Sequence, residues 1–273
     1  MLSHIIFLGL FYAVLAVVSA TVALSLFRAA RHFRARRAEA ICWQVTFPDL
    51  PARERVCRHE FTGEFQHRTC DKAFDCRECQ THAALVAKRP PDAAPLPREA
   101  REARQEDVFG LEFPLDRFYH RGHAWAHPQP DGTVTVGLDA LGARLVVEPE
   151  AIELPAVGTH IQTNGAAWQV RKRGADVRIL SPLDGEVIAT GGSQHGWYLK
   201  VKPDGGQLDA RHLLRGAEIR PWIAREMERL QAALAPANQA PTMADGGVPM
   251  DDIAAGYPDA DWDAVCAEIF LQP

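Results

Sequence analysis

Four cysteines lie close together in the first third of the chain, with the spacing C-x12-C-x5-C-x2-C. They are Cys57, Cys70, Cys76 and Cys79. The last two form a C-x2-C pair, which lets two thiolates from one tight turn reach the same ion, and the two upstream cysteines can complete a tetrahedron. The spacing therefore predicts a metal site with Zn2+ as the expected ion. An iron–sulfur cluster and cysteines without any metal are the alternatives.

Other metal-binding residue types occur near and beyond these cysteines. His59, His67 and His82 could replace a cysteine as a ligand, but we expect ordinary surface histidines or histidines that support the ligands. Cys42 and Cys266 stand alone, and isolated cysteines are more often packing residues.

The sequence shows no catalytic set. Three histidines and two aspartates lie between residues 120 and 139, but nothing pairs them with a nucleophile. Ser181 precedes a proline and lacks the context of a nucleophile elbow. We therefore expect a protein that is not an enzyme, with His123 serving in packing and hydrogen bonding.

An uncharged apolar run near the start of the chain predicts a membrane anchor. Residues 5–27 carry no charge, and a helix of that length, about 34 Å, can cross a hydrocarbon core of roughly 30 Å. A cleaved signal peptide is the alternative, but its positive charge would precede the apolar run. Here the arginines follow it, in a basic segment over 28–56 that can also meet anionic lipid head groups.

The position of these arginines predicts the topology. Positive charges remain on the cytosolic side, so we expect a single pass through a bacterial-type inner (cytoplasmic) membrane, with the N-terminus outside and the rest in the cytosol. Disulfides are disfavoured there, which strengthens the metal interpretation. The net charge of −5 argues against a general nucleic-acid binder.

The rest of the chain divides by composition. We expect a cysteine-rich module over 57–87, a proline-rich linker with a short charged helix over 88–107, and a β-rich domain over 108–221. Strand-like runs occur at 133–136, 167–170, 177–180, 186–189 and 197–201, separated by turns rich in glycine. Short strands with such turns indicate a sandwich or barrel, and residues 139–145 suit a brief helix.

Short helices are expected at the C-terminal end. Apolar residues recur at helical spacing over 222–235, residues 236–260 have the composition of a disordered linker, and 261–273 suit a short amphipathic helix. That last helix can dock on its own domain or bind a protein partner that the sequence does not identify.

Several motifs in the β-rich domain resemble the glycine cleavage system H protein, a lipoyl carrier of the barrel-sandwich type. The matching segments are His123-Ala124-Trp125, Asp131 to Gly137, Glu153 to Gly158, Ser181 to Val187 and Gly196 to Pro203. They cover roughly residues 115–220. The resemblance implies a mainly β, lipoyl-type barrel-sandwich hybrid fold. The cysteine segment is similar to one found before H-like domains in some bacterial membrane proteins of unassigned role, which supports the architecture without giving a function.

The same resemblance bears on the cofactor. The family's modified lysine lies seven residues before the serine of its Ser-Pro pair, and that position here is Gly174. Lys172 is two residues early, which moves its amine about 6–7 Å from the hairpin tip. We therefore expect no lipoyl group, with Lys172 as the sole plausible acceptor if one is attached.

These observations predict a membrane-tethered, H-like domain that has lost its lipoyl lysine and acts as a non-enzymatic scaffold or adaptor. Two alternatives stay open. One is a lipoyl carrier that uses Lys172 to shuttle groups between enzymes at the membrane. The other is a metal or redox sensor built on the four cysteines.

Overall fold

The computed structural model describes residues 11–12, 19, 21–22, 47, 50, 52, 55–88, 105–235 and 249–271. By contacts the chain divides into two units, 1–41 and 42–273. Across the described ranges, no helix combines the length and apolarity needed to cross a membrane. The predicted span over 5–27 and most of the basic segment over 28–56 lie outside those ranges, so both stay predictions.

Antiparallel strands dominate the second unit, as the sequence predicted. In the described part of the chain they form a six-stranded sheet, a three-stranded sheet and a hairpin. The six-stranded sheet has the order β3 (Phe118–Tyr119), β4 (Ala124–Pro128), β5 (Val134–Leu138), β11 (Trp197–Pro203), β10 (Gly185–Gly192) and β7 (His160–Ile161). The three-stranded sheet has the order β6 (Ala151–Glu153), β8 (Ala166–Lys172) and β9 (Ala175–Leu180).

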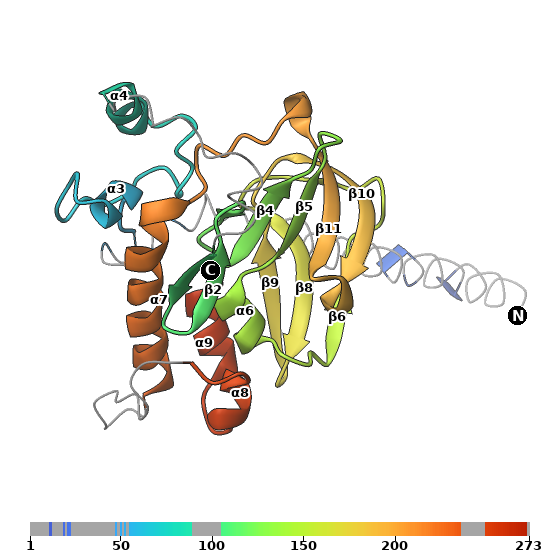
Figure 1. Ribbon diagram of the computed structural model, residues 1–273. Helices are drawn as coiled ribbons and strands as arrows, with labels where there is room; N and C mark the ends of the chain where they lie inside the picture. Colours follow the sequence, from blue (N-terminus) through green and yellow to red (C-terminus); the bar gives the residue numbers. More distant parts are fainter. Residues whose placement is uncertain are drawn as a thin grey trace, which may run out of the picture. The chain divides into compact units, whose positions relative to one another are not determined.

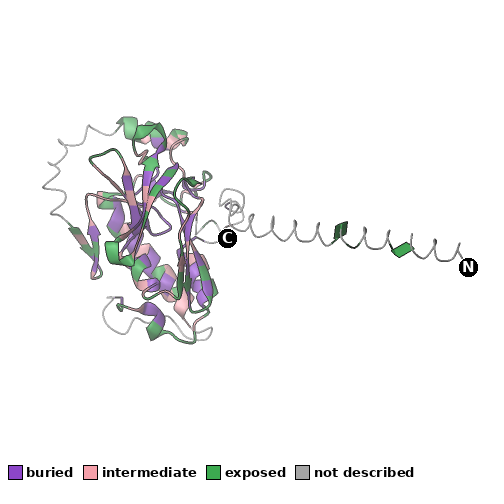
Figure 2. Cartoon of the chain, turned by 90° about the vertical axis from the view of Figure 1, so that its right-hand side faces the viewer, coloured by how far each residue is buried: buried purple, intermediate pink, exposed green. Residues whose placement is uncertain are grey.

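The core lies between the two larger sheets. Trp168 of β8 stacks on Tyr198 of β11, with ring centroids 5.1 Å apart and an interplanar angle of 17°. Strand residues alternate in burial because successive side chains point to opposite faces, and the buried positions gather in the sheets (Figure 2). The chain is therefore mainly β over 105–220, as expected.

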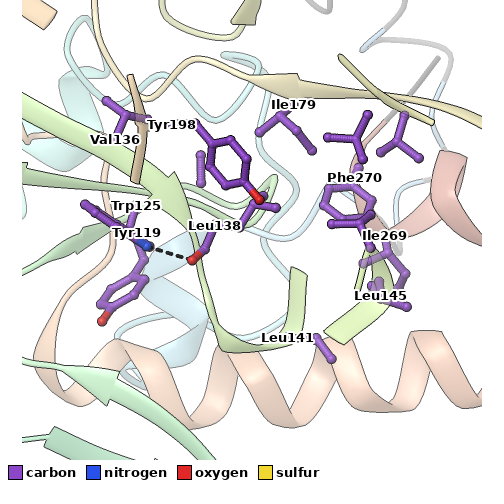
Figure 3. Packing of buried hydrophobic residues seen from close by; sticks show 14 of the residues in the cluster. Tyr119, Trp125, Val136, Leu138, Leu141, Leu145, Ile179, Tyr198, Ile269 and Phe270 are labelled. Atoms are coloured by element: carbon purple, nitrogen blue, oxygen red, sulfur yellow. Dashed lines mark hydrogen bonds between the residues drawn. The ribbon is translucent and has the colours of Figure 1, made fainter. Parts of the chain in front are cut away.

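A tryptophan fixes the pairing of β4 and β5. The indole nitrogen of Trp125 donates to the carbonyl of Leu138 at 2.7 Å (Figure 3). Its ring lies so close to Gly137 that a Cβ added there would be 2.4 Å from the ring, which would have to shift. A small residue at this position is thus required by packing.

Two helices follow or interrupt the strands as the sequence predicted. Helix α6 (Ala140–Leu145) is capped by Asp139, whose Oδ1 accepts from the backbone nitrogen of Gly142 at 2.8 Å. Helix α7 (Ile219–Leu234) buries one apolar face and begins three residues before the predicted start. Single 3₁₀ turns occur at η2 (Ser193–His195), η3 (Asp204–Gly206) and η4 (Gly216–Glu218).

The C-terminal segment folds back onto this domain. Helix α9 (Trp262–Ile269) packs against α7 and β9 (Figure 1). Part of the predicted disordered linker is ordered, because residues 253–256 form helix α8 and bury Ile253 and Ala254. Residues 236–248 lie outside the described ranges.

We define the cysteine module as residues 55–88. It contains α3 (Arg58–Phe61), α4 (Gln80–Lys88) and an antiparallel bridge between Val56 and Thr69. Helix α3 lies beside the N-terminal end of α7 (Figure 1). A small apolar cluster joins the module to both ends of the unit, and it comprises Phe47, Ala73, Phe74, Leu180 and Leu271.

One expectation about the linker was wrong. The last residues of the predicted charged helix form strand β1 (Gln105–Val108), which pairs with β2 (Leu111–Pro114) in a hairpin. Val108 and Leu111 are fully buried at the turn end of this hairpin. Their burial against the domain outweighs the helical preference of the preceding charged run.

Candidate functional site

The β8–β9 hairpin ends in a two-residue turn. Lys172 pairs with Ala175, so Arg173 and Gly174 form the tip. Both have positive φ, 50° for Arg173 and 78° for Gly174, which is the pattern of the tight turns that suit the right-handed twist of paired strands. The structure thus places at the tip the residue that the motif spacing predicted, and it is a glycine.

Lys172 lies inside the structure and not at the tip. Its side chain is 10% exposed. The ammonium donates to the carbonyl of Val147 and lies 3.4 Å from Oδ2 of Asp252. Asp252 is itself held in place, because its Oδ1 caps α8 by accepting from the backbone nitrogen of Ala255. The amine is therefore enclosed by the loop after α6 and by the C-terminal segment.

The predicted amphipathic tail uses its apolar face within the chain. Trp262, Val265, Cys266 and Ile269 are all buried on α9, and Arg229 of α7 donates to the carbonyl of Glu268 at 2.6 Å. The isolated Cys266 is a packing residue, as expected. A partner that used this face would first have to displace the helix.

The four module cysteines line one small cavity. The Val56–Thr69 bridge places Cys57 and Cys70 on the same face of the paired segments, because both neighbour the bridged pair. Cys76 and Cys79 lie in a turn in which the backbone nitrogen of Cys79 donates to the carbonyl of Cys76 at 3.2 Å. The cavity between them measures about 20 Å3.

The thiols do not converge on a point in this arrangement. Among the described residues, no group of three or more Cys, His, Asp or Glu side chains is placed to hold a metal ion. The five cysteines in the described ranges are all free thiols. The metal prediction for Cys57, Cys70, Cys76 and Cys79 therefore stays a prediction, with its ligands gathered around one cavity.

Two histidines near the cysteines are buried, which fits the ligand-supporting position that was expected as the alternative to a surface position. His59 and His82 are 2% and 9% exposed, and Nε2 of His59 lies 3.0 Å from Nδ1 of His82. Both line the cavity. His67, which was expected to be an ordinary surface residue, is exposed.

Two buried arginines, which sequence reasoning did not single out, also line the cavity. Arg58 makes a bidentate pair with Glu218, at 2.8 Å and 2.6 Å. Arg121 donates to the carbonyl of Val56 at 2.6 Å, and its guanidinium lies 4.0 Å from the ring centre of Phe74. Their hydrogen-bond partners are 65 to 160 residues away in the chain, so no local pattern could reveal them.

Burial shifts two of the cavity thiols toward the protonated form. Burial raises the pKa of Cys76 to about 11, although Arg58 and Arg121 act to lower it. Burial also raises the pKa of Cys57. Because the thiolate is the reactive form of cysteine, burial lowers the reactivity of these two thiols in this arrangement.

A second polar cluster lies beneath α7. Nδ1 of His123 lies 2.8 Å from Oδ2 of Asp139, Nε2 lies 3.9 Å from Glu226, and the ring stacks on Trp222. Burial alone would lower the pKa of His123, but the two carboxylates outweigh it and raise the pKa to about 9. The cluster is fully enclosed, which agrees with the packing role predicted for His123.

Sequence and structure comparisons identify relatives of the β domain. A family model described as "Glycine cleavage H-protein" matches residues 117–195. The chain is 32% identical over 99 residues to the "Glycine cleavage system H protein" of Saccharophagus degradans, covering 32% of this chain and 76% of that protein.

Other relatives are covered more completely. The chain is 31% identical to the "Glycine cleavage system H protein 2" of Pseudomonas syringae pv. tomato, covering 38% of this chain and 91% of that protein. A crystal structure of a glycine cleavage system H protein from Mycobacterium marinum aligns at 21% identity with a TM-score of 0.35, over 41% of this chain and 98% of that one.

Proposed function

The chain belongs to the glycine cleavage system H protein family, and from that premise we propose that it is a membrane-tethered member that carries no lipoyl group and acts as a non-enzymatic scaffold. Its β domain is proposed to be the lipoyl-type barrel-sandwich hybrid of that family. The scaffold would present the surfaces of an H-like domain to protein partners in the cytosol.

The hairpin tip is the single observation that carries this proposal. A lipoyl arm needs a lysine amine that an attaching enzyme can reach, and the tip holds Arg173 and Gly174 instead. The nearest lysine in sequence, Lys172, has its ammonium against the carbonyl of Val147 and the carboxylate of Asp252. Exposing it would break both contacts, so the geometry favours a domain without the cofactor.

Intact-mass analysis of the full-length chain tests this. The protein is purified in detergent from cells that contain lipoyl-attaching enzymes, with an H protein relative expressed beside it as a positive control. We expect the unmodified mass for this chain and the lipoylated mass for the control. An added lipoyl group that disappears in Lys172→Arg would overturn the scaffold proposal and establish the carrier alternative.

A matched variant restores the missing group. Gly174→Lys places a lysine at the hairpin tip, where a Cβ would meet no other atom within 4 Å. The positive φ of 78° disfavours a side chain by about 1–2 kcal/mol, which the hairpin should tolerate. We expect this variant, unlike the wild type, to gain lipoyl.

The membrane tether is supported by the sequence of residues 5–27 and by the arginines that follow. We expect the full-length chain to stay in the membrane fraction after alkaline extraction. A Leu15→Arg variant places a charge in the centre of the apolar run, at a cost of about 2.5–3.5 kcal/mol, and should appear partly in the soluble fraction. Wild-type protein that is fully soluble would refute the tether.

A further inference from the structure

We propose that Cys57, Cys70, Cys76 and Cys79 bind one zinc ion in the cavity between the cysteine module and the β domain, and that this ion fixes the module on the domain. The proposal concerns the cysteine module and does not depend on whether Lys172 carries a lipoyl group.

The first support is that all four cysteines line the same cavity. The bridge brings Cys57 and Cys70 to one face, and the turn before α4 brings Cys76 and Cys79 to the other side of the same cavity. Four thiolates form a closed tetrahedral zinc site with Zn–S distances of about 2.3 Å. Each sulfur is carried on one rotatable bond, so rotamer changes can turn the thiols inward without a change of fold.

The size of the cavity favours a single ion. A volume of about 20 Å3 has room for roughly one water molecule. A zinc ion fits such a space once the thiols turn toward it, whereas an iron–sulfur cluster brings several iron and sulfide atoms. The cavity would have to expand considerably to hold a cluster, against the buried contacts of the module.

The charges around the cavity favour a thiolate centre. A zinc ion with four thiolates carries a net charge of about −2. Arg121 is 8% exposed, and no carboxylate in the described ranges lies within ion-pair distance of its guanidinium. A buried cation without a counter-charge is costly. Because Arg121 lines the cavity, the negative zinc–thiolate centre would supply the missing charge.

Because the cavity is lined by residues of both the module and the β domain, an ion bound there would hold the two together. The module supplies the cysteines that line the cavity, while Arg121 and His212 come from the β domain. Around it, Asn164 donates to the carbonyl of Ala73 at 3.1 Å, and Arg77 pairs with Asp184. These contacts reach the loop between β7 and β8 and the segment that follows β9, so metal binding and docking of the module should strengthen each other.

Metal analysis tests the site. The full-length chain is purified in detergent under reducing conditions, without a histidine tag, and its zinc, iron and sulfide contents are measured. We expect about one zinc per chain and no iron or sulfide. Cys70→Ser and Cys76→Ser should abolish zinc binding, while Cys266→Ser, which alters the buried cysteine of α9, should retain it.

A variant of Arg121 tests the charge argument. Arg121→Met keeps the apolar stem but removes the charge, and we expect the zinc affinity to fall by about tenfold or more. Arg171→Met, which alters an arginine with a 50% exposed side chain, is the matched control and should leave the affinity unchanged. Equal affinities in both variants would overturn the role of Arg121.

Hydrogen exchange tests whether the ion fixes the module on the β domain. Removal of zinc by a chelator should increase exchange across residues 55–88 by at least tenfold, with little change in β8 and β11. The proposal is overturned by a reduced protein that binds no metal, by iron with sulfide, by zinc that persists in the Cys70 and Cys76 variants, or by module exchange that does not respond to the chelator.

Discussion

The buried pair of Arg58 and Glu218 should decide how firmly the cysteine module sits on the β domain. Both side chains are 8% exposed, and two hydrogen bonds of 2.8 Å and 2.6 Å join them. Glu218→Gln keeps the shape of the side chain but removes its charge. Arg58 is then left buried without its carboxylate, which typically costs about 3–5 kcal/mol.

Local opening is the expected consequence, because this pair joins two parts of one folded unit. A loss of 3–5 kcal/mol corresponds to an increase of roughly 150-fold to 5,000-fold in the fraction of undocked module. The measurement is hydrogen exchange across residues 55–88, with the exchange of β5 and β11 as an internal reference for global unfolding. Zinc content is measured in parallel to separate undocking from metal loss.

A double variant isolates the interaction. Arg58→Met combined with Glu218→Leu removes both charges and leaves apolar groups, a change that is often close to neutral at buried ion pairs. We expect the double variant to be more stable than Glu218→Gln alone, with a coupling energy above about 1 kcal/mol in the double-mutant cycle. If Glu218→Gln changes module exchange less than fivefold, the pair is not what holds the module.

Three further changes follow from the structure. Asp252→Ala should make Lys172 roughly fivefold more reactive toward acetic anhydride in mass-spectrometric labelling, equivalent to about 1 kcal/mol. Asp251→Ala, at a fully exposed carboxylate, should leave the labelling unchanged. Equal labelling of Lys172 in both variants would show that Asp252 does not shield the amine. His123 has a pKa raised to about 9, above the ordinary value near 6.5, so its charge contributes stability below about pH 6.5 that is lost as the pH rises through 9. The free energy of unfolding from urea titrations should fall over that range by no more than about 3 kcal/mol, and His123→Asn should flatten the profile. Gly137→Ala would place a methyl group into the buried indole ring beside it, and we expect a loss of about 1–3 kcal/mol in urea unfolding followed by fluorescence.

The sequence predicted features that depend on local pattern. Strand-like runs located five strands of the β domain, β5, β8, β9, β10 and β11, and counting back from Ser181 placed Gly174 at the hairpin tip, where β8 and β9 have it. These predictions succeeded because strand period and turn composition are properties of short segments. The brief helix after Asp139 was found for the same reason, since its cap lies next to it in sequence.

Features that depend on distant partners were missed. The role of Arg121 follows from how the module meets the domain, because Arg121 donates to Val56, which lies 65 residues earlier in the chain. The first residues of strand β1 were expected to be helical because they end a charged run. The pairing of β1 with β2 buries Val108, and that burial cannot be read from the charged residues before it. Tertiary contacts decided each case.

The small apolar cluster that joins Phe47, Phe74, Leu180 and Leu271 sets a limit on the timing of folding. Phe47 precedes the module, while Leu271 follows the last helix. During synthesis the earlier residues leave the ribosome many seconds before Leu271, since chains grow at about 5–20 residues per second. The module can therefore complete its apolar contacts only after the C-terminal helix has been made, so a chain released early would leave that surface open to chaperones and proteases.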